Sequence, residues 1–202
     1  MKALHKPNLF CWSQFDEDRN IDFHSYLWLR EQGNIVFDPL PLTKHDSEHL
    51  QSLGGVSVII LSNSDHVREA ASLAKVTGAE IWGPLAEQDT FPIQCSTWIN
   101  ECSGICDGLD VYCMDGSKTK GELAFVIENE TLITGDLIRA HIAGALCMLP
   151  EAKLNDVEKA KASIERVANI TGIQAILPGD GWPVFRHGEK ALSELVLAIK
   201  EK

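Results

Sequence analysis

One segment of the sequence limits the choice of fold more than any other, the stretch from residue 56 to residue 82. Residues 56–61 are apolar except for Ser57, as is typical of a strand buried on both faces. Apolar residues then recur at helical spacing across residues 65–76, and residues 80–82 resemble a second short strand. This order predicts a β-α-β unit with Asp65 at the start of its helix.

The rest of the sequence contains more predicted strands than predicted helices. Aromatic and β-branched segments predict strands at residues 9–15, 21–29, 35–37, 109–114, 122–128, 131–134 and 175–177. Helical periodicity predicts helices at residues 47–53, 156–170 and 189–200. We therefore expect an α/β fold of four layers, an αββα sandwich in which two mixed β-sheets pack face to face with helices outside. No linker or repeat interrupts the pattern, so we predict a single domain over residues 1–202.

The charge balance narrows the choice of binding partner. The 202 residues include 18 Lys and Arg but 29 Asp and Glu, which gives a net charge of −11 at pH 7. An acidic surface repels phosphate backbones and anionic lipids, so we expect no nucleic-acid partner and no membrane partner. We expect instead a small-molecule substrate or ligand.

Hydropathy and cysteine use predict a cytoplasmic location. No apolar run approaches the roughly 20 residues of a membrane span, and the first residues lack an apolar stretch of signal-peptide length. The six cysteines are therefore interpreted as reduced thiols, and no C-x2-C motif supports a redox role for Cys102, Cys106 or Cys113. Aromatic residues near the N-terminus belong either to the core or to a homodimer contact, namely Trp12, Phe15, Tyr26 and Trp28.

Polar residues follow three of the predicted strands. Asp65 and His66 come after the first buried strand, Asp136 follows Gly135, and Asp180 follows Gly179. Each acid alone is explained by a helix cap or a surface turn. Strands that share a direction bring their carboxyl ends to one edge of a sheet, so one histidine and three carboxylates could converge on a cation.

The order of these segments resembles the metallo-β-lactamase fold superfamily, over roughly residues 20–190. The family signature is His-x-His-x-Asp-His, then a histidine in a glycine-rich turn, then Gly-Asp, then Gly-His-Gly. Asp65 and His66 match the end of the first motif, and Asp136 matches the acid that bridges two metals. Asp180 stands where the family has its last histidine, and Asp38 resembles an acid that supports the metal ligands from behind.

The departures from the signature imply that one of the two metal sites is lost. Leu61 and Asn63 replace the first two histidines, and Ser117 replaces the third. The resemblance leaves one site, for a single divalent metal such as Zn²⁺, Mn²⁺ or Fe²⁺, with four ligands. These are Asp65, His66, Asp136 and Asp180, and the first three are the predicted catalytic residues.

The resemblance implies a mononuclear metal-dependent hydrolase of an ester, thioester, lactone or phosphoester. Its predicted substrate-binding residues are Asn63, Ser117, Lys118, Arg139, His141 and Trp182. The alternative is a metal-free relative without catalytic activity, either a pseudoenzyme whose pocket binds nothing or a module that binds a small molecule. In that case Arg139, Lys118 or Arg186 must turn inward to compensate the charge of the acids.

Overall fold

The computed structural model describes residues 1–101 and 103–201, in which two β-sheets face each other. In this part of the chain the first sheet has seven strands in sequence order: β1 (Lys2–Ala3), β2 (Leu9–Asp16), β3 (Ile21–Trp28), β4 (Ile35–Phe37), β5 (Val58–Ile60), β6 (Glu80–Pro84) and β7 (Thr97–Ile99). Neighbouring strands are antiparallel from β1 to β4 and parallel from β4 to β7. The parallel half carries the β-α-β unit that the sequence predicts.

The second sheet has the strand order β13-β10-β9-β8. Its strands are β8 (Leu109–Cys113), β9 (Leu123–Ile127), β10 (Thr131–Thr134) and β13 (Ala175–Pro178), and only β13 runs parallel to its neighbour. A separate ribbon of two antiparallel strands, β11 (Ile138–Ile142) and β12 (Ala145–Met148), follows β10. Neither β7 nor this ribbon was predicted from the sequence.

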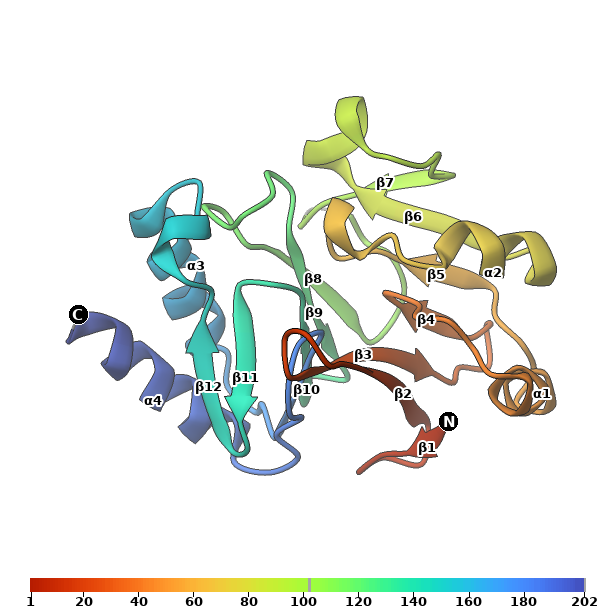
Figure 1. Cartoon of the computed structure of the whole chain (residues 1–202), viewed down its shortest axis with the longest axis horizontal. Coiled ribbons are helices and arrows are strands. Elements are labelled where there is room, and N and C mark those ends of the chain that lie inside the picture. The colour runs from red at the N-terminus through yellow and green to blue at the C-terminus, as the bar shows by residue number, and fades with distance from the viewer. Residues whose placement is uncertain (102, 202) are drawn as a thin grey trace.

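Helices cover the outer faces of both sheets, as Figure 1 shows. Two of them, α1 (Lys44–Ser52) and α2 (Ala70–Thr77), lie on the first sheet, and α3 (Val157–Ala168) and α4 (Gly188–Lys200) lie on the second. The 3₁₀ turns are η1 (Ser64–His66), η2 (Leu85–Thr90) and η3 (Glu151–Lys153). The predicted αββα sandwich is therefore confirmed.

Successive side chains of a strand point to opposite faces of its sheet, so the buried side chains divide among three hydrophobic cores. In β4, Phe37 points between the sheets while Val36 faces α1 and α2. In β9, Phe125 points between the sheets while Val126 faces α3 and α4. The rings of Phe37 and Phe125 lie 5.2 Å apart, so they join the two sheets directly. This packing fixes the strand ends that carry the candidate site.

The N-terminal aromatic residues are divided between core and surface. Trp12, Tyr26 and Trp28 are buried, so these three belong to the core rather than to a dimer contact. Phe15 is 52% exposed. The homodimer itself stays a prediction.

The helix after β5 begins later than the sequence predicts. Asp65 lies in the single turn η1, and α2 begins at Ala70. The side chain of Asn63 caps η1 by accepting a hydrogen bond from the Asp65 N–H group. Arg68 then has a φ of +37°, which a continuous right-handed helix does not allow. The side chains of η1 are thereby separated from those of α2.

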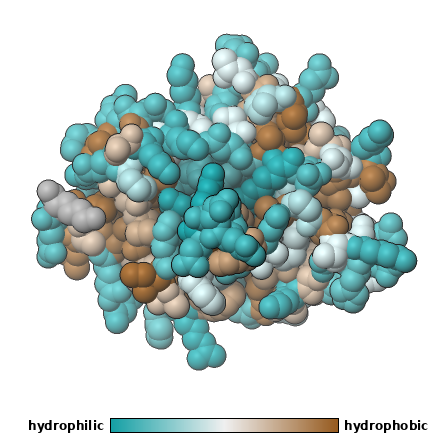
Figure 2. Space-filling model, viewed as in Figure 1, coloured by the Kyte–Doolittle hydropathy of each residue, from teal (hydrophilic) through white to brown (hydrophobic). Residues whose placement is uncertain are grey.

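Figure 2 shows hydrophilic side chains at the middle of one face of the molecule, over the β2–β3 loop of Figure 1. This loop holds Glu17, Asp18, Arg19 and Asn20. Among the described residues, no helix combines the length and the apolar character that crossing a membrane requires.

Candidate metal centre

Three strand ends meet at one edge of the sandwich. His66 follows β5, and Asp136 and Asp180 follow the parallel neighbours β10 and β13, whose last residues pair as Thr134 with Pro178. One ligand atom from each of His66, Asp136 and Asp180 lies within 4.8 Å of the other two, and all three residues are buried. A Cβ atom on Gly179 would lie 2.9 Å from His66 Cε1, so glycine allows this close approach.

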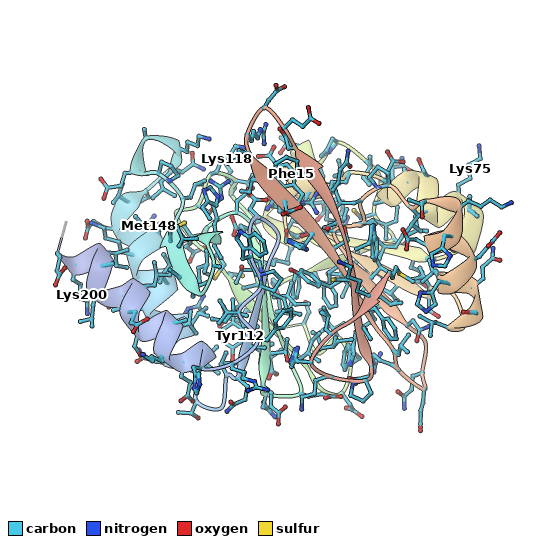
Figure 3. The ribbon with its side chains drawn as sticks, turned by 60° about the horizontal axis from the view of Figure 1, so that its bottom comes forward. Phe15, Lys75, Tyr112, Lys118, Met148 and Lys200 are labelled. Atoms are coloured by element: carbon cyan, nitrogen blue, oxygen red, sulfur yellow. The ribbon has the colours of Figure 1, made fainter. Side chains whose placement is uncertain are left out.

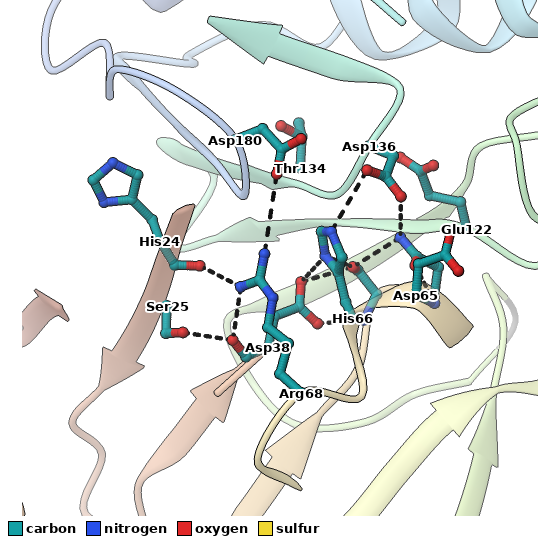
Figure 4. A network of polar contacts seen from close by, with 12 residues as sticks. His24, Ser25, Asp38, Asp65, His66, Arg68, Glu122, Thr134, Asp136 and Asp180 are labelled. Carbon is teal, nitrogen blue, oxygen red and sulfur yellow. Dashed lines mark hydrogen bonds and ion pairs between the residues drawn. The ribbon is translucent and has the colours of Figure 1, made fainter. Parts of the chain in front are cut away.

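Asp38 and Ser62 contact the same nitrogen of the His66 imidazole, and Figure 4 shows Asp38 beside this ring. His66 Nδ1 lies 2.9 Å from Asp38 Oδ2 and 3.0 Å from Ser62 Oγ. Asp38 also accepts hydrogen bonds from the Ser62 backbone N–H group at 2.8 Å and from Ser62 Oγ at 2.7 Å. His66 Nε2 faces Asp136 Oδ1 at 3.6 Å. Asp38 therefore occupies the supporting position that the family resemblance implies, and Nε2 points to the centre of the cluster.

The two carboxylates on either side determine the charge of His66. Burial and the charge of Arg68 lower the pKa of His66, but Asp38 and Asp136 outweigh them and raise it to about 10. Burial raises the pKa of Asp136, yet His66, Lys118 and Arg139 hold it well below its usual range. Without a metal, His66 is thus an imidazolium between two carboxylates.

Two arginines contact Asp180. Arg139 Nη2 lies 2.8 Å from Asp180 Oδ2, and Arg68 Nη2 lies 4.0 Å from Asp180 Oδ1. Arg68 Nη1 also donates hydrogen bonds to the backbone oxygens of His24 at 2.7 Å and Asp38 at 3.0 Å. Asp180 Oδ1 is buried, and within the described residues it has no hydrogen-bond partner. One oxygen of Asp180 is therefore available to a ligand.

The structure does not bring Asp65 into the cluster of His66, Asp136 and Asp180. Its side chain is 43% exposed and forms an ion pair with Lys118 Nζ. Of the cations that a metal-free site would require, Lys118 and Arg139 do turn toward the acids. Arg186, the third predicted cation, lines a different cavity. Arg68, which was not predicted, contacts Asp180 instead. Nothing in the motif marks Arg68, because its contacts depend on its left-handed backbone conformation.

The positions of the lost histidines are filled by core and hydrogen-bonded groups. Leu61 is fully buried in the core beneath α1 and α2. Asn63 Nδ2 lies 3.4 Å from Asp136 Oδ2, and Ser117 Oγ donates a hydrogen bond to Glu122. Glu122 was not predicted as a site residue because its position falls in the predicted strand at residues 122–128, whereas β9 begins at Leu123. Burial and the charge of Asp136 raise its pKa to about 8.

A cavity of about 380 Å³ opens above this cluster. Asp136 and Asp180 form the acidic part of its lining. The cationic part is larger and consists of Arg19, Lys118, Arg139 and Lys153, and His141 also lines the cavity. Trp182 was predicted to join these residues, but the structure places it in a second cavity with Phe185.

The thiols do not favour the redox alternative. Burial raises the pKa of both Cys106 and Cys113, which makes their reactive thiolate forms scarcer. Cys102 lies outside the described residues.

The αββα sandwich and the His/Asp/Asp cluster at its strand ends fit the fold and the site that the family resemblance implies. The sequence profile of the metallo-beta-lactamase superfamily matches residues 1–199, and the chain belongs to this superfamily. The resemblance found in the sequence is thereby confirmed. No curated protein matches the chain in sequence.

Solved structures share the fold at low sequence identity. A metallo-beta-lactamase from Pontibacter korlensis has a TM-score of 0.76 and 12% identity, covering 99% of this chain and 98% of that one. A metallo-beta-lactamase from Hirschia baltica has a TM-score of 0.74 and 13% identity, with 96% of both chains covered. The metallo-beta-lactamase FIM-1 from Pseudomonas aeruginosa, in a mono-zinc form, has a TM-score of 0.72 and 12% identity, covering 94% and 90%. At this identity the likeness shows the fold alone.

Proposed function

We propose that this chain is a mononuclear metal-dependent hydrolase whose cation is held by His66, Asp136 and Asp180. The observation that carries the proposal is the cluster of three buried ligand atoms within 4.8 Å of one another. An imidazole nitrogen and two carboxylate oxygens suit Zn²⁺, Mn²⁺ or Fe²⁺. A divalent cation bound there would supply Lewis acidity and a water of lowered pKa. The mono-zinc form of FIM-1 offers a precedent for one metal in this fold.

The chain's own residues prepare this site for a cation. Asp38 accepts the Nδ1 hydrogen of His66, which leaves Nε2 as the ligating atom. Arg68 and Arg139 form ion pairs with Asp180 and fix the orientation of its carboxylate. Oδ1, which has no hydrogen-bond partner among the described residues, is therefore held in one position. These contacts explain why the donors converge before any ligand arrives.

The proposed substrate is a small ester, thioester, lactone or phosphoester with an anionic group. Lys118, Arg139 and His141 line the cavity above the cluster, together with Arg19 and Lys153. A cationic lining in a protein of net charge −11 concentrates positive potential at one place. Asn63 and Ser117, also predicted to bind substrate, are not among the residues that line this cavity; their side chains contact Asp136 and Glu122.

Calorimetric titration of metal-stripped protein with Zn²⁺, Mn²⁺ and Mg²⁺ tests the proposal, followed by assay of a panel of the four substrate types. We expect binding tighter than about millimolar, which His66→Ala and Asp136→Ala abolish. Asp65→Asn serves as the matched acid variant: a loss as large as that of Asp136→Ala would show that Asp65 is a ligand after all. Binding without hydrolysis of any substrate would contradict the enzymatic part of the proposal.

The second candidate function is a metal-free module that binds a small anion. It is favoured by the ion pairs that already compensate the acids, from Lys118 to Asp65 and from Arg139 to Asp180. Titration with inorganic phosphate in the presence of a chelator tests it. Phosphate binding that Lys153→Met weakens, and that Lys75→Met on α2 leaves unchanged, would support the module; no binding would reject it.

A further inference from the structure

A second cavity lies beside the metal centre and has no part in the proposed hydrolysis. Its volume is about 770 Å³, about twice that of the cavity above the metal centre, and it falls in the range typical of small-molecule sites. Strands β1 to β3 form one wall, and the segment after Asp180 forms the other. The lining includes aromatic and cationic side chains, namely Lys2, His5, His24, Trp182, Phe185 and Arg186.

Aromatic rings form the apolar part of this cavity. Trp182 is 56% exposed and Phe185 is 41% exposed, although both are large apolar side chains. The ring of His5 lies 5.7 Å from that of Phe185. Burial lowers the pKa of His5, so its ring is neutral at neutral pH. Exposed aromatic rings around a cavity of this size are typical of a surface that contacts a flat ligand.

His24 supplies a hydrogen-bond acceptor without a partner. The residue is 9% exposed, and the Gly181 backbone carbonyl lies beside one nitrogen of its ring. Burial lowers the pKa of His24, so the ring is neutral and its second nitrogen, Nδ1, is an acceptor. Within the described residues Nδ1 has no partner. Figure 4 shows this ring directed away from Arg68 and Asp180, on the opposite side from the metal centre.

Two cations stand at the cavity without a fixed counter-charge. Lys2 and Arg186 are exposed, and neither has an ion pair with any described residue. Asp22 is the acid in the lining. Because the whole protein carries a net charge of −11, unpaired cations here favour an anionic ligand over a cationic one.

We propose that this cavity binds a small aromatic anion that also carries an O–H or N–H donor. The aromatic ring lies against Trp182 and Phe185, and the donor reaches His24 Nδ1. The anionic group lies near Lys2 and Arg186. This site is distinct from the metal centre and does not depend on the proposed function.

The probe for this proposal is 8-anilinonaphthalene-1-sulfonate, which combines fused rings, a sulfonate and an N–H group. We expect calorimetry to give one site per chain, and we expect Trp182→Ala and Arg186→Gln each to weaken binding by about tenfold. The matched controls are Leu197→Ala on α4, an exposed apolar side chain, and Lys75→Gln on α2, an exposed cation that Figure 3 labels at the edge of the molecule; neither residue lines this cavity. Both controls should bind the probe as the parent chain does.

A second comparison distinguishes specific binding in this cavity from nonspecific hydrophobic binding of the probe. N-phenyl-1-naphthylamine lacks the sulfonate, and we expect it to bind at least about tenfold more weakly than the sulfonate. Asp136→Ala at the metal centre should leave probe binding unchanged. Equal affinity of the parent chain, Trp182→Ala and Arg186→Gln, or equal affinity for the neutral analogue, would overturn the proposal.

Discussion

Glu122 offers the sharpest test of how this site controls charge, through the substitution Glu122→Gln. The carboxyl group is 1% exposed, accepts a hydrogen bond from the Leu137 N–H group at 2.8 Å, and also accepts one from Ser117. Glutamine keeps the shape and can keep both contacts, but it cannot ionise. The variant therefore isolates the effect on the free energy of unfolding of burying a negative charge beside Asp136.

The expected size of the effect follows from the shifted pKa. Burial and Asp136 raise the pKa of Glu122 from its usual 4.5 to about 8. Between these two values the folded state binds the proton more tightly than the unfolded state does, so the free energy of unfolding falls as pH rises. At about 1.4 kcal/mol per pH unit, the loss between about pH 5.5 and pH 8 is roughly 3 kcal/mol at most.

Urea unfolding at about pH 5.5, 7 and 8.5 measures this difference. We expect Glu122→Gln to match the parent chain at the lowest pH and to become more stable than it as pH rises. Glu31→Gln in an exposed loop is the control and should follow the parent chain throughout. If the parent chain and Glu122→Gln change in parallel with pH, Glu122 is already ionised at low pH and the account of its burial is wrong.

Three further substitutions test the packing around the site by chemical denaturation. Phe125→Ala removes the ring that joins the two sheets and should cost about 3–5 kcal/mol, whereas Phe15→Ala at the surface should cost little. Arg68→Met removes a donor from the His24 carbonyl and one of two donors from the buried Asp38 carbonyl, which keeps the Ser25 hydroxyl, and we expect a loss of about 1–3 kcal/mol; an unchanged stability would show that these bonds do not matter. Gly181→Ala would place a Cβ atom 2.0 Å from the backbone oxygen of Ala140 at a φ of +93°, so we expect little folded protein, and normal folding would contradict this geometry.

The layered fold was predictable because its strands carry clear patterns. Phe37 and Val36 alternate between two cores, and the apolar run that ends at Leu61 is buried on both faces. The β11–β12 ribbon escaped prediction because it is partly exposed: Ile142 at its tip is 72% exposed, so no strict alternation develops.

The candidate site was predictable where a motif ends a strand. Asp136 and Asp180 follow glycines after apolar strands, and the structure brings both to His66. Arg68 and Glu122 escaped prediction for physical reasons. A left-handed backbone directs Arg68 into the cluster, and the unusual pKa of Glu122 depends on burial that only the folded chain creates.

Asp65 and Trp182 show the limit of the family resemblance. Asp65 holds its place in the motif, but the turn η1 leaves its carboxylate exposed beside Lys118. Trp182 follows Asp180 by two residues, yet it lines the neighbouring cavity. Sequence distance places a residue near a site, whereas the local backbone decides which side of the chain its side chain occupies.

The most direct test of the central claim is the anomalous diffraction signal of crystals soaked with Mn²⁺. We expect one peak per chain, about 2.0–2.2 Å from His66 Nε2 and from one oxygen each of Asp136 and Asp180. The same soak of His66→Ala crystals should give no peak there. A peak at Asp65 and Lys118, or none near His66 in the parent chain, would contradict the proposed metal centre.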